Sequence, residues 1–106
     1  MKYLVIAAAL VATSSVSAAG DANRGKALSA TCAGCHGENG VSQIKTYPIL
    51  AGQYASYIEQ ALKDYKSGAR ANAIMKGFAA GLSAQDMKDL AAYFASQPSD
   101  LDTLPR

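Results

Sequence analysis

Two cysteines and a histidine stand within five consecutive residues, Cys32-Ala33-Gly34-Cys35-His36, and the chain has no other cysteine or histidine. This C-x-x-C-H spacing is the attachment signature of a c-type haem. Two thiols three positions apart on one turn can add to the two vinyl groups of a haem and form two thioether bonds. His36 then presents a ring nitrogen to the iron as the proximal ligand. We therefore expect one covalent haem c, with its iron, as the cofactor.

Other chemistries of these side chains fit less well. A disulfide between Cys32 and Cys35 would close a very small loop and constrain little of the unfolded chain. A structural zinc site usually takes four nitrogen or sulfur ligands, and the cysteines and histidine of this chain supply three. A thioredoxin-like redox pair needs a βαβ context, which the sequence lacks. Haem attachment is the preferred interpretation.

An iron bound by one histidine has a second axial position, and methionine sulfur is its usual occupant in electron-transfer cytochromes. Of the three methionines, Met1 is removed with the leader described below, and Met87 belongs to the apolar stripe of a predicted helix. Met75 lies in a predicted loop beside Gly77, where the backbone can bend to bring sulfur to iron. We predict Met75 as the distal ligand. A loop methionine that packs beside an open haem remains the alternative.

Residues 1–19 have the layout of a secretory signal peptide: a short basic start, an apolar stretch, and then small residues. Cleavage is expected after Ala18 or Ala19. The apolar stretch falls short of the ~20 residues that a membrane-spanning helix needs, so no membrane insertion is expected after leader removal. Because haem c is attached outside the cytoplasm, we expect a mature domain over 20–106 in a bacterial periplasm.

Helical periodicity appears in three segments, 22–32, 53–67 and 84–96, and no segment is convincing as a strand. Asp21 is the expected N-cap of the first. This segment also contains Gly25, which leaves room for another helix to cross closely.

The second segment ends at Gly68, a residue suited to a helix C-cap. The third begins at Ser83, which forms a capping-box pattern with Asp86 three residues later. Its apolar stripe predicts one buried face, made by Met87, Leu90, Ala91 and Phe94.

The mature part carries nine basic and eight acidic side chains, a net charge of +1. That balance does not indicate binding to nucleic acid or to an anionic membrane surface. Its 87 residues suit one small domain with a modest core of its own. Two long loops, 37–52 and 68–82, are expected to form the walls of a cofactor pocket. The second loop contains a predicted helical turn near 72–76.

This order of elements resembles class I cytochromes c across the whole mature chain. The local sequence is similar to small monohaem bacterial members of the cytochrome c553-like type and to single halves of the dihaem cytochrome c4. A single C-x-x-C-H makes this a monohaem chain. The resemblance implies an all-α fold, with three main helices and loops wrapped around one haem. The similar stretches are 47–53, 68–72, Leu82-Ser83 and 90–94.

The resemblance also implies roles for individual residues. The Pro48 carbonyl would bind the second ring nitrogen of His36 and so fix the ring, as partners of metal-bound histidines do. Leu50 would pack on the haem, and Arg70 or Asn72 would reach a haem propionate.

The resemblance implies an electron carrier rather than an enzyme, because no side chain is needed as an acid, base or nucleophile. Its partners would be donor and acceptor proteins that dock transiently near the haem edge, where Lys45 and Lys76 could lie, and the protein would be a monomer. Two alternatives stay open. One is a haem subunit of a larger periplasmic redox enzyme, and the other is a five-coordinate haem protein that binds small gases or peroxide.

Overall fold

The computed structural model describes residues 20–43 and 47–99. These two ranges contain five α-helices, one short 3-10 helix and no strand, which confirms the all-α class. None of the described helices is long and apolar enough to cross a membrane. The leader predicted over 1–19, and Lys45, lie outside the described residues. The elements are α1 (Ala22–Leu28), η1 (Ser29–Thr31), α2 (Ala33–His36), α3 (Ala55–Ser67), α4 (Ala73–Ala79) and α5 (Ala84–Ala95).

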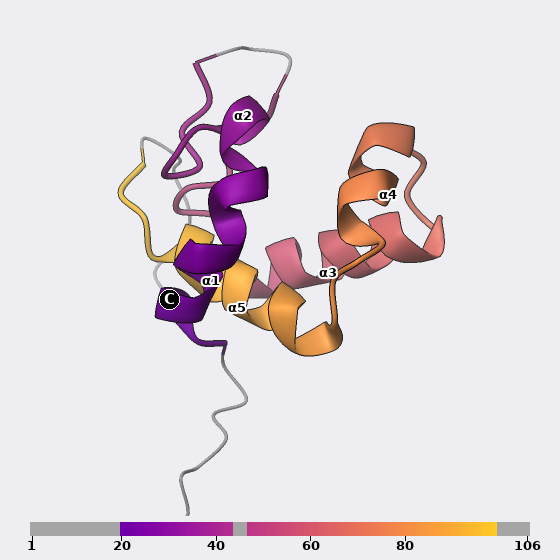
Figure 1. The fold of residues 1–106 in the computed structure, drawn as a ribbon. Coiled ribbons are helices and arrows are strands. Elements are labelled where there is room, and N and C mark those ends of the chain that lie inside the picture. Colours follow the sequence, from indigo (N-terminus) through magenta and orange to yellow (C-terminus); the bar gives the residue numbers. More distant parts are fainter. Residues whose placement is uncertain (1–19, 44–46, 100–106) are drawn as a thin grey trace, which may run out of the picture.

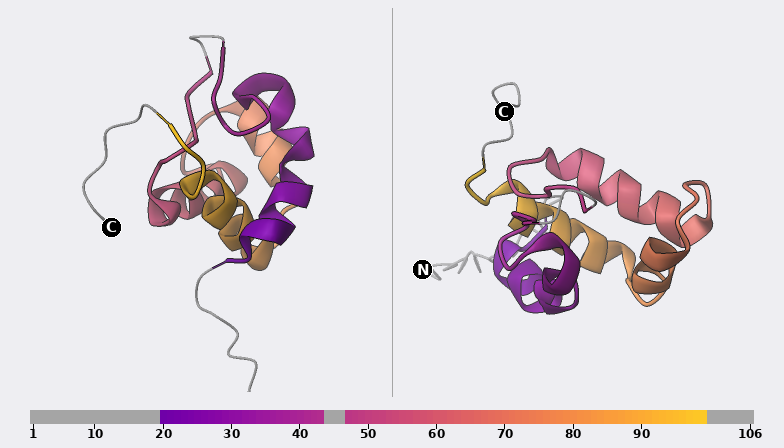
Figure 2. Two further views of the ribbon diagram at one scale, coloured as in Figure 1. Left: turned by 90° about the vertical axis from the view of Figure 1, so that its left-hand side faces the viewer. Right: turned by 90° about the horizontal axis from the view of Figure 1, so that it is seen from above.

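Helix α5 is the centre of the packing, with α1 against one side and α3 against the other. In Figure 1, α1 and α2 form one arm of the molecule and α4 forms a second arm, while α3 and α5 lie between and below them. Figure 2 shows α3 and α5 running alongside each other. The buried core comes mainly from α5 and is made by Ile58, Leu90, Ala91, Tyr93 and Phe94.

Helix α1 crosses α5 at very short distance because residue 25 is glycine. A Cβ atom added at Gly25 would lie 1.9 Å from the Asp89 carbonyl oxygen and 2.9 Å from Cβ of Tyr93. The close crossing that the sequence predicts is therefore present.

A buried carboxylate fastens the same crossing. The Asp89 side chain is 1% exposed and accepts hydrogen bonds from the Asp21 backbone N–H (2.7 Å) and the Gln85 amide (2.9 Å). It also forms an ion pair with Arg24, whose other guanidinium nitrogen lies 2.8 Å from Asp86. Burial opposes ionisation of Asp89, but these three donors outweigh it and hold the pKa of the carboxyl below its ordinary value. The first turn of α1 is thereby held to α5.

The helix ends follow their predicted chemistry. Asp21 accepts from the N–H groups of residues 23 and 24 at the start of α1. Ser83 and Asp86 form a complete capping box at the start of α5, and the backbone N–H of Ser83 is the main group that lowers the pKa of Asp86. Gly68 ends α3 in the left-handed conformation, with a φ of 87°.

Two predicted elements differ from the structure. The first helix does not run unbroken over 22–32, because α1 ends at Leu28 and a 3-10 turn follows. The Ser29 hydroxyl donates to the Lys26 carbonyl (2.7 Å), a back-bond that bends helices. The predicted turn near 72–76 is the longer helix α4, since Asn72 caps it from outside.

Candidate functional site

The cysteine–histidine motif lies on the short helix α2 and the residue before it. The Cys32 N–H donates to the Ser29 carbonyl (2.9 Å), and the His36 N–H donates to the Cys32 carbonyl (2.9 Å). One turn of helix thus separates Cys32 from His36. The 3-10 turn η1 joins α1 to this turn, and the side chains of Cys32, Cys35 and His36 line one cavity.

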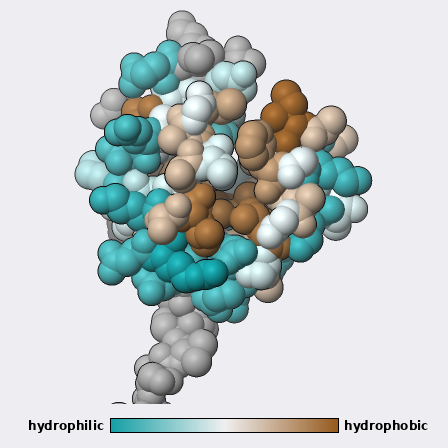
Figure 3. Space-filling view, viewed as in Figure 1, coloured by the Kyte–Doolittle hydropathy of each residue, from teal (hydrophilic) through white to brown (hydrophobic). Residues whose placement is uncertain are grey.

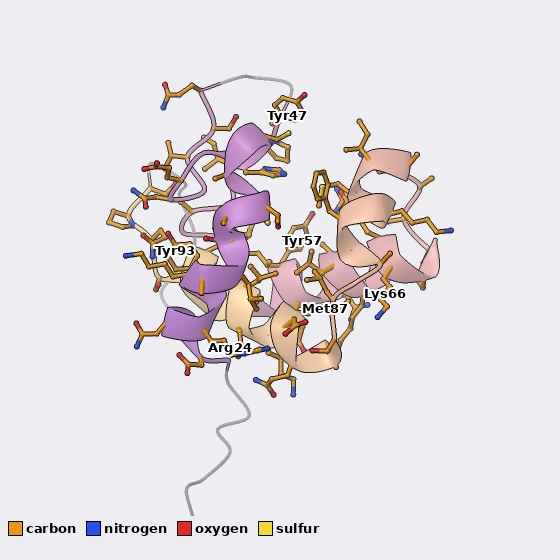
Figure 4. All side chains as sticks on the ribbon, viewed as in Figure 1. Arg24, Tyr47, Tyr57, Lys66, Met87 and Tyr93 are labelled. Carbon is orange, nitrogen blue, oxygen red and sulfur yellow. The ribbon has the colours of Figure 1, made fainter. Side chains whose placement is uncertain are left out.

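That cavity has a volume of about 360 Å³. Apolar side chains of α3, α4, α5 and the loop 47–53 form most of its wall. Figure 3 shows apolar side chains around the hollow between the two arms. Figure 4 shows Tyr57 of α3 between the arms. Every predicted site residue is part of the lining, namely Cys32, Cys35, His36, Pro48, Leu50, Arg70 and Met75.

The His36 ring is held in a defined orientation. It is 6% exposed, and its Nδ1 atom lies 2.8 Å from the Pro48 carbonyl oxygen. A carbonyl can only accept, so Nδ1 carries the proton and Nε2 keeps a free lone pair for a metal. The ring of Tyr47 meets the imidazole edge-on, with 6.3 Å between ring centroids. The hydrogen bond expected between Pro48 and His36 is therefore present.

The loop that carries Pro48 is tied back on itself and onto α5. The Gly40 carbonyl accepts from the N–H groups of Leu50 (2.8 Å) and Ala51 (3.1 Å), and the Gly52 N–H donates to the Phe94 carbonyl (3.0 Å). Gly40 has a φ of 78°, and a Cβ there would lie 2.7 Å from the Phe94 ring. Only glycine fits this crossing without strain. The acceptor for His36 is thus positioned by α5.

Met75 reaches the cavity from α4, the second arm, and not from a loop as predicted. The side chain of Asn72 accepts from the N–H groups of Ile74 and Met75 (3.1 Å each), so the helix starts early enough to include Met75. Gly77 lies inside this helix. Met87 is buried in the core at 3% exposure and does not line the cavity.

Arg70 brings the only charge among the described residues of the cavity wall. Its guanidinium carbon lies 4.8 Å from the centre of the Tyr65 ring, which also lines the cavity. Such cation–π stacking fixes a long side chain while leaving its donors free. Asn72 lines the cavity as well, but its side-chain oxygen is used as the α4 cap. Leu50 joins the cavity wall to the core.

The polarity of the site suits a large apolar ring better than a bare metal ion. Burial raises the pKa of the Cys32 thiol, which reflects its apolar surroundings. Within the ranges 20–43 and 47–99, no three His, Cys, Asp or Glu side chains converge as a metal site. His36 and Met75 are too few donors to hold iron by themselves, whereas a macrocycle already supplies four nitrogens. The residues present therefore fit a covalently attached haem.

Sequence reasoning overlooked several aromatic and aliphatic residues of the wall, among them Tyr47, Ile74 and Phe78. A signal for two of them was available. Ile74 and Phe78 stand four positions apart around Met75, which is the spacing of one helix face.

A family model described as cytochrome c matches residues 22–98. Cytochrome c-554(548) of Halomonas halodenitrificans is 44% identical over 82 residues, which are 74% of this chain and 99% of that protein. Cytochrome c4 of Pseudomonas aeruginosa is 48% identical over 80 residues, and the chain spans only 40% of its length. The structure of reduced cytochrome c4 from Pseudomonas stutzeri superimposes with a TM-score of 0.72 at 40% identity, covering 76% of this chain and 47% of that one.

Proposed function

This chain belongs to the cytochrome c family, and from that premise we propose that it is a freely diffusing periplasmic carrier with His36 and Met75 as axial iron ligands. It is an electron carrier with one covalent haem c on Cys32 and Cys35. The observation that carries the proposal is the convergence of these four side chains on one apolar cavity.

The bound haem supplies a one-electron iron couple, and the protein groups set its surroundings. Cys35 on α2 and Cys32 just before it would hold the ring through thioether bonds. The hydrogen bond from Nδ1 of His36 to the Pro48 carbonyl aims Nε2 and makes it a stronger donor. Met75 would offer its thioether to the iron, and such a ligand favours the reduced state and raises the potential.

The walls of the cavity serve the same reaction. Apolar side chains such as Leu50, Leu62 and Phe94 exclude water, so little solvent reorganises when the charge changes. Arg70, held over Tyr65, is proposed to face an acidic substituent of the ring. No side chain has to move a proton.

Attachment and export are tested together on protein recovered from the periplasm. Intact-mass spectrometry and a pyridine haemochrome assay should report one haem per chain, with the chain beginning at residue 19 or 20. Free thiols without a bound tetrapyrrole would refute the proposal. Gel filtration of the native protein from its own extract should show a free monomer, and co-elution with a larger redox enzyme would favour the subunit alternative.

The axial ligand is tested with a pair of methionine variants. Met75→Ala should lower the reduction potential by an amount on the order of 0.1 V, because axial ligands set haem potentials over most of a volt. It should also let the ferrous protein bind carbon monoxide. Met87→Leu is the matched control, since this methionine is buried away from the cavity, and it should leave both properties unchanged. The opposite outcome would assign Met87 as the ligand.

A further inference from the structure

Helix α4 carries Met75 and packs chiefly on α3. Ala79 in its last turn is fully buried and Met75 is half-buried, whereas the other residues of α4 are exposed. Figure 1 shows the chain descending from this arm to the start of α5. A segment with so little buried surface opens more readily than the core does. The position of Met75 therefore depends on the bonds that fix the two ends of its helix.

The end that leads into α4 is fixed by the backbone alone. The N–H groups of Gly68 and Arg70 both donate to the Asp64 carbonyl (3.0 and 3.1 Å). Gly68 has a φ of 87°, the left-handed conformation that closes the end of α3. This entry is a helix cap, and no side-chain bond is needed to form it.

The short connection from α4 to α5 has mostly local bonds. The Ala80 N–H donates to the Lys76 carbonyl (3.0 Å), and the Leu82 N–H donates to the Ala79 carbonyl (3.1 Å). An added Cβ at Gly81 would meet nothing within 4 Å, so no neighbour crowds the chain at that point. These bonds can move together with α4, and they do not hold it to another helix.

A single side chain from α3 reaches this connection. Lys66 stands in the last turn of α3, and its ammonium donates to the Leu82 carbonyl at 2.6 Å. The two residues are 16 positions apart, and the segment between them contains α4. Leu82 also packs against the buried core. The bond thus ties the exit of the Met75 segment to the helix on which α4 packs.

We propose that Lys66 is a positioning residue for the axial methionine, an inference that rests on the proposed function. Its bond to the Leu82 carbonyl holds α4 against α3, so that Met75 stays in the wall of the cavity and within reach of the iron. Lys66 does not line the cavity itself, so it acts on the iron site only through α4. A hydrogen bond in an exposed place contributes modestly to stability. Its loss should therefore change how often α4 opens without unfolding the domain.

Cyanide binding to the ferric, haem-loaded protein measures this opening, because cyanide can take the axial position only after Met75 has left it. At saturating cyanide the observed rate becomes the rate at which Met75 departs. Lys66→Gln removes the ammonium and shortens the side chain, and it should raise this limiting rate about fivefold. Lys66→Arg keeps a long cationic donor and should react like wild type.

Lys63→Gln is the matched control. It removes the same charge from the same helix, but Lys63 pairs with Glu59 within α3. Glutamine and lysine have nearly equal helix propensities, so neither variant weakens α3 through propensity. The cyanide reaction of Lys63→Gln should equal that of wild type.

A merely structural role of Lys66 predicts another pattern. A cation near a helix C-terminus stabilises that helix, and its removal would then speed amide hydrogen exchange only in the last turn of α3. Positioning predicts faster exchange throughout α4, with exchange in α5 unchanged. The inference requires both the faster cyanide reaction and the faster exchange of α4 in Lys66→Gln, and the absence of either would overturn it.

Failure of the proposed function gives a distinct result. The weak long-wavelength absorption band of a ferric sulfur–iron bond should be present in wild type and absent in Met75→Ala. A wild-type protein without this band, or a Met75→Ala variant that keeps it, refutes Met75 as the ligand. If both behave as expected while Lys66→Gln matches Lys63→Gln, only the role of Lys66 is refuted.

Discussion

Gly25→Ala should separate α1 from α5. The added Cβ would lie 1.9 Å from the Asp89 carbonyl oxygen, whereas real Cβ atoms essentially never come nearer than 3.0 Å. The helices must therefore move apart by roughly 1 Å, which also lengthens the contacts of Arg24 and Asp21 to Asp89. Alanine gains about 1 kcal/mol in helix propensity, but forced overpacking costs about 1–3 kcal/mol and sometimes more.

The clash cannot be relieved by a small side-chain movement. The atoms that obstruct the new Cβ belong to the backbone of Asp89 and to the buried side chain of Tyr93. We therefore place the overpacking cost at the top of its range, about 3 kcal/mol. After the propensity gain of about 1 kcal/mol is subtracted, the free energy of unfolding should fall by about 2 kcal/mol. For a domain of this size, that corresponds to a fall of about 10 °C in Tm. Guanidinium unfolding of the haem-loaded protein, followed by far-ultraviolet circular dichroism, measures the change.

Gly77→Ala is the matched control for this experiment. Gly77 also lies inside a seven-residue helix, but an added Cβ there meets nothing within 4 Å. This variant should be more stable than wild type by about 0.5–1 kcal/mol. If Gly25→Ala were stabilised to the same extent, the close crossing of α1 and α5 would be wrong.

Three more variants test other contacts. Asp89→Asn should destabilise the protein at pH 7 by about 1–3 kcal/mol through weakened hydrogen bonds. Because the pKa of Asp89 is lowered in the folded protein, its ionised form contributes stability above pH ~4, and this stability is lost as the pH falls further. Chemical unfolding should therefore show the stabilities of wild type and Asp89→Asn converging in acid. A stability difference that stays constant with pH would exclude this linkage. Ser83→Ala should lower the free energy of unfolding by about 1 kcal/mol because it removes the α5 cap. Ser83→Thr keeps a capping hydroxyl and should keep most of that stability in the same assay. Leu90→Ala should cost about 2–5 kcal/mol as measured by thermal unfolding, and a loss below 1 kcal/mol would contradict the burial of this side chain.

Local chemistry made much of this fold predictable. Helix α5 shows both a capping box and a periodic apolar stripe, and the structure has it over nearly the predicted range. The cysteine–histidine motif identified the cofactor because the spacing of the groups is itself the chemical requirement. The seven predicted site residues all line one cavity, although their individual roles toward the haem stay predictions.

Other features depend on contacts between distant segments. From the sequence, Gly77 predicted a bend in a loop. In the structure, Asn72 caps helix α4, and this helix continues through Gly77. The break after Leu28 follows from a side-chain bond of Ser29 that competes with the helix. Likewise, the pairing of Arg24 with Asp89 joins residues 65 positions apart, and no local pattern predicts which of several carboxylates meets that guanidinium.

The two arms of the cavity are unequally anchored. The His36 arm is held by the α1–α5 crossing and by a loop bonded to Phe94, whereas the Met75 arm packs chiefly on α3. Segments with fewer buried contacts open at lower free energy than the core does. Amide hydrogens of α4 should therefore exchange sooner than those of α5. If Met75 and His36 bind the iron as proposed, the bond from Met75 should be lost first on warming.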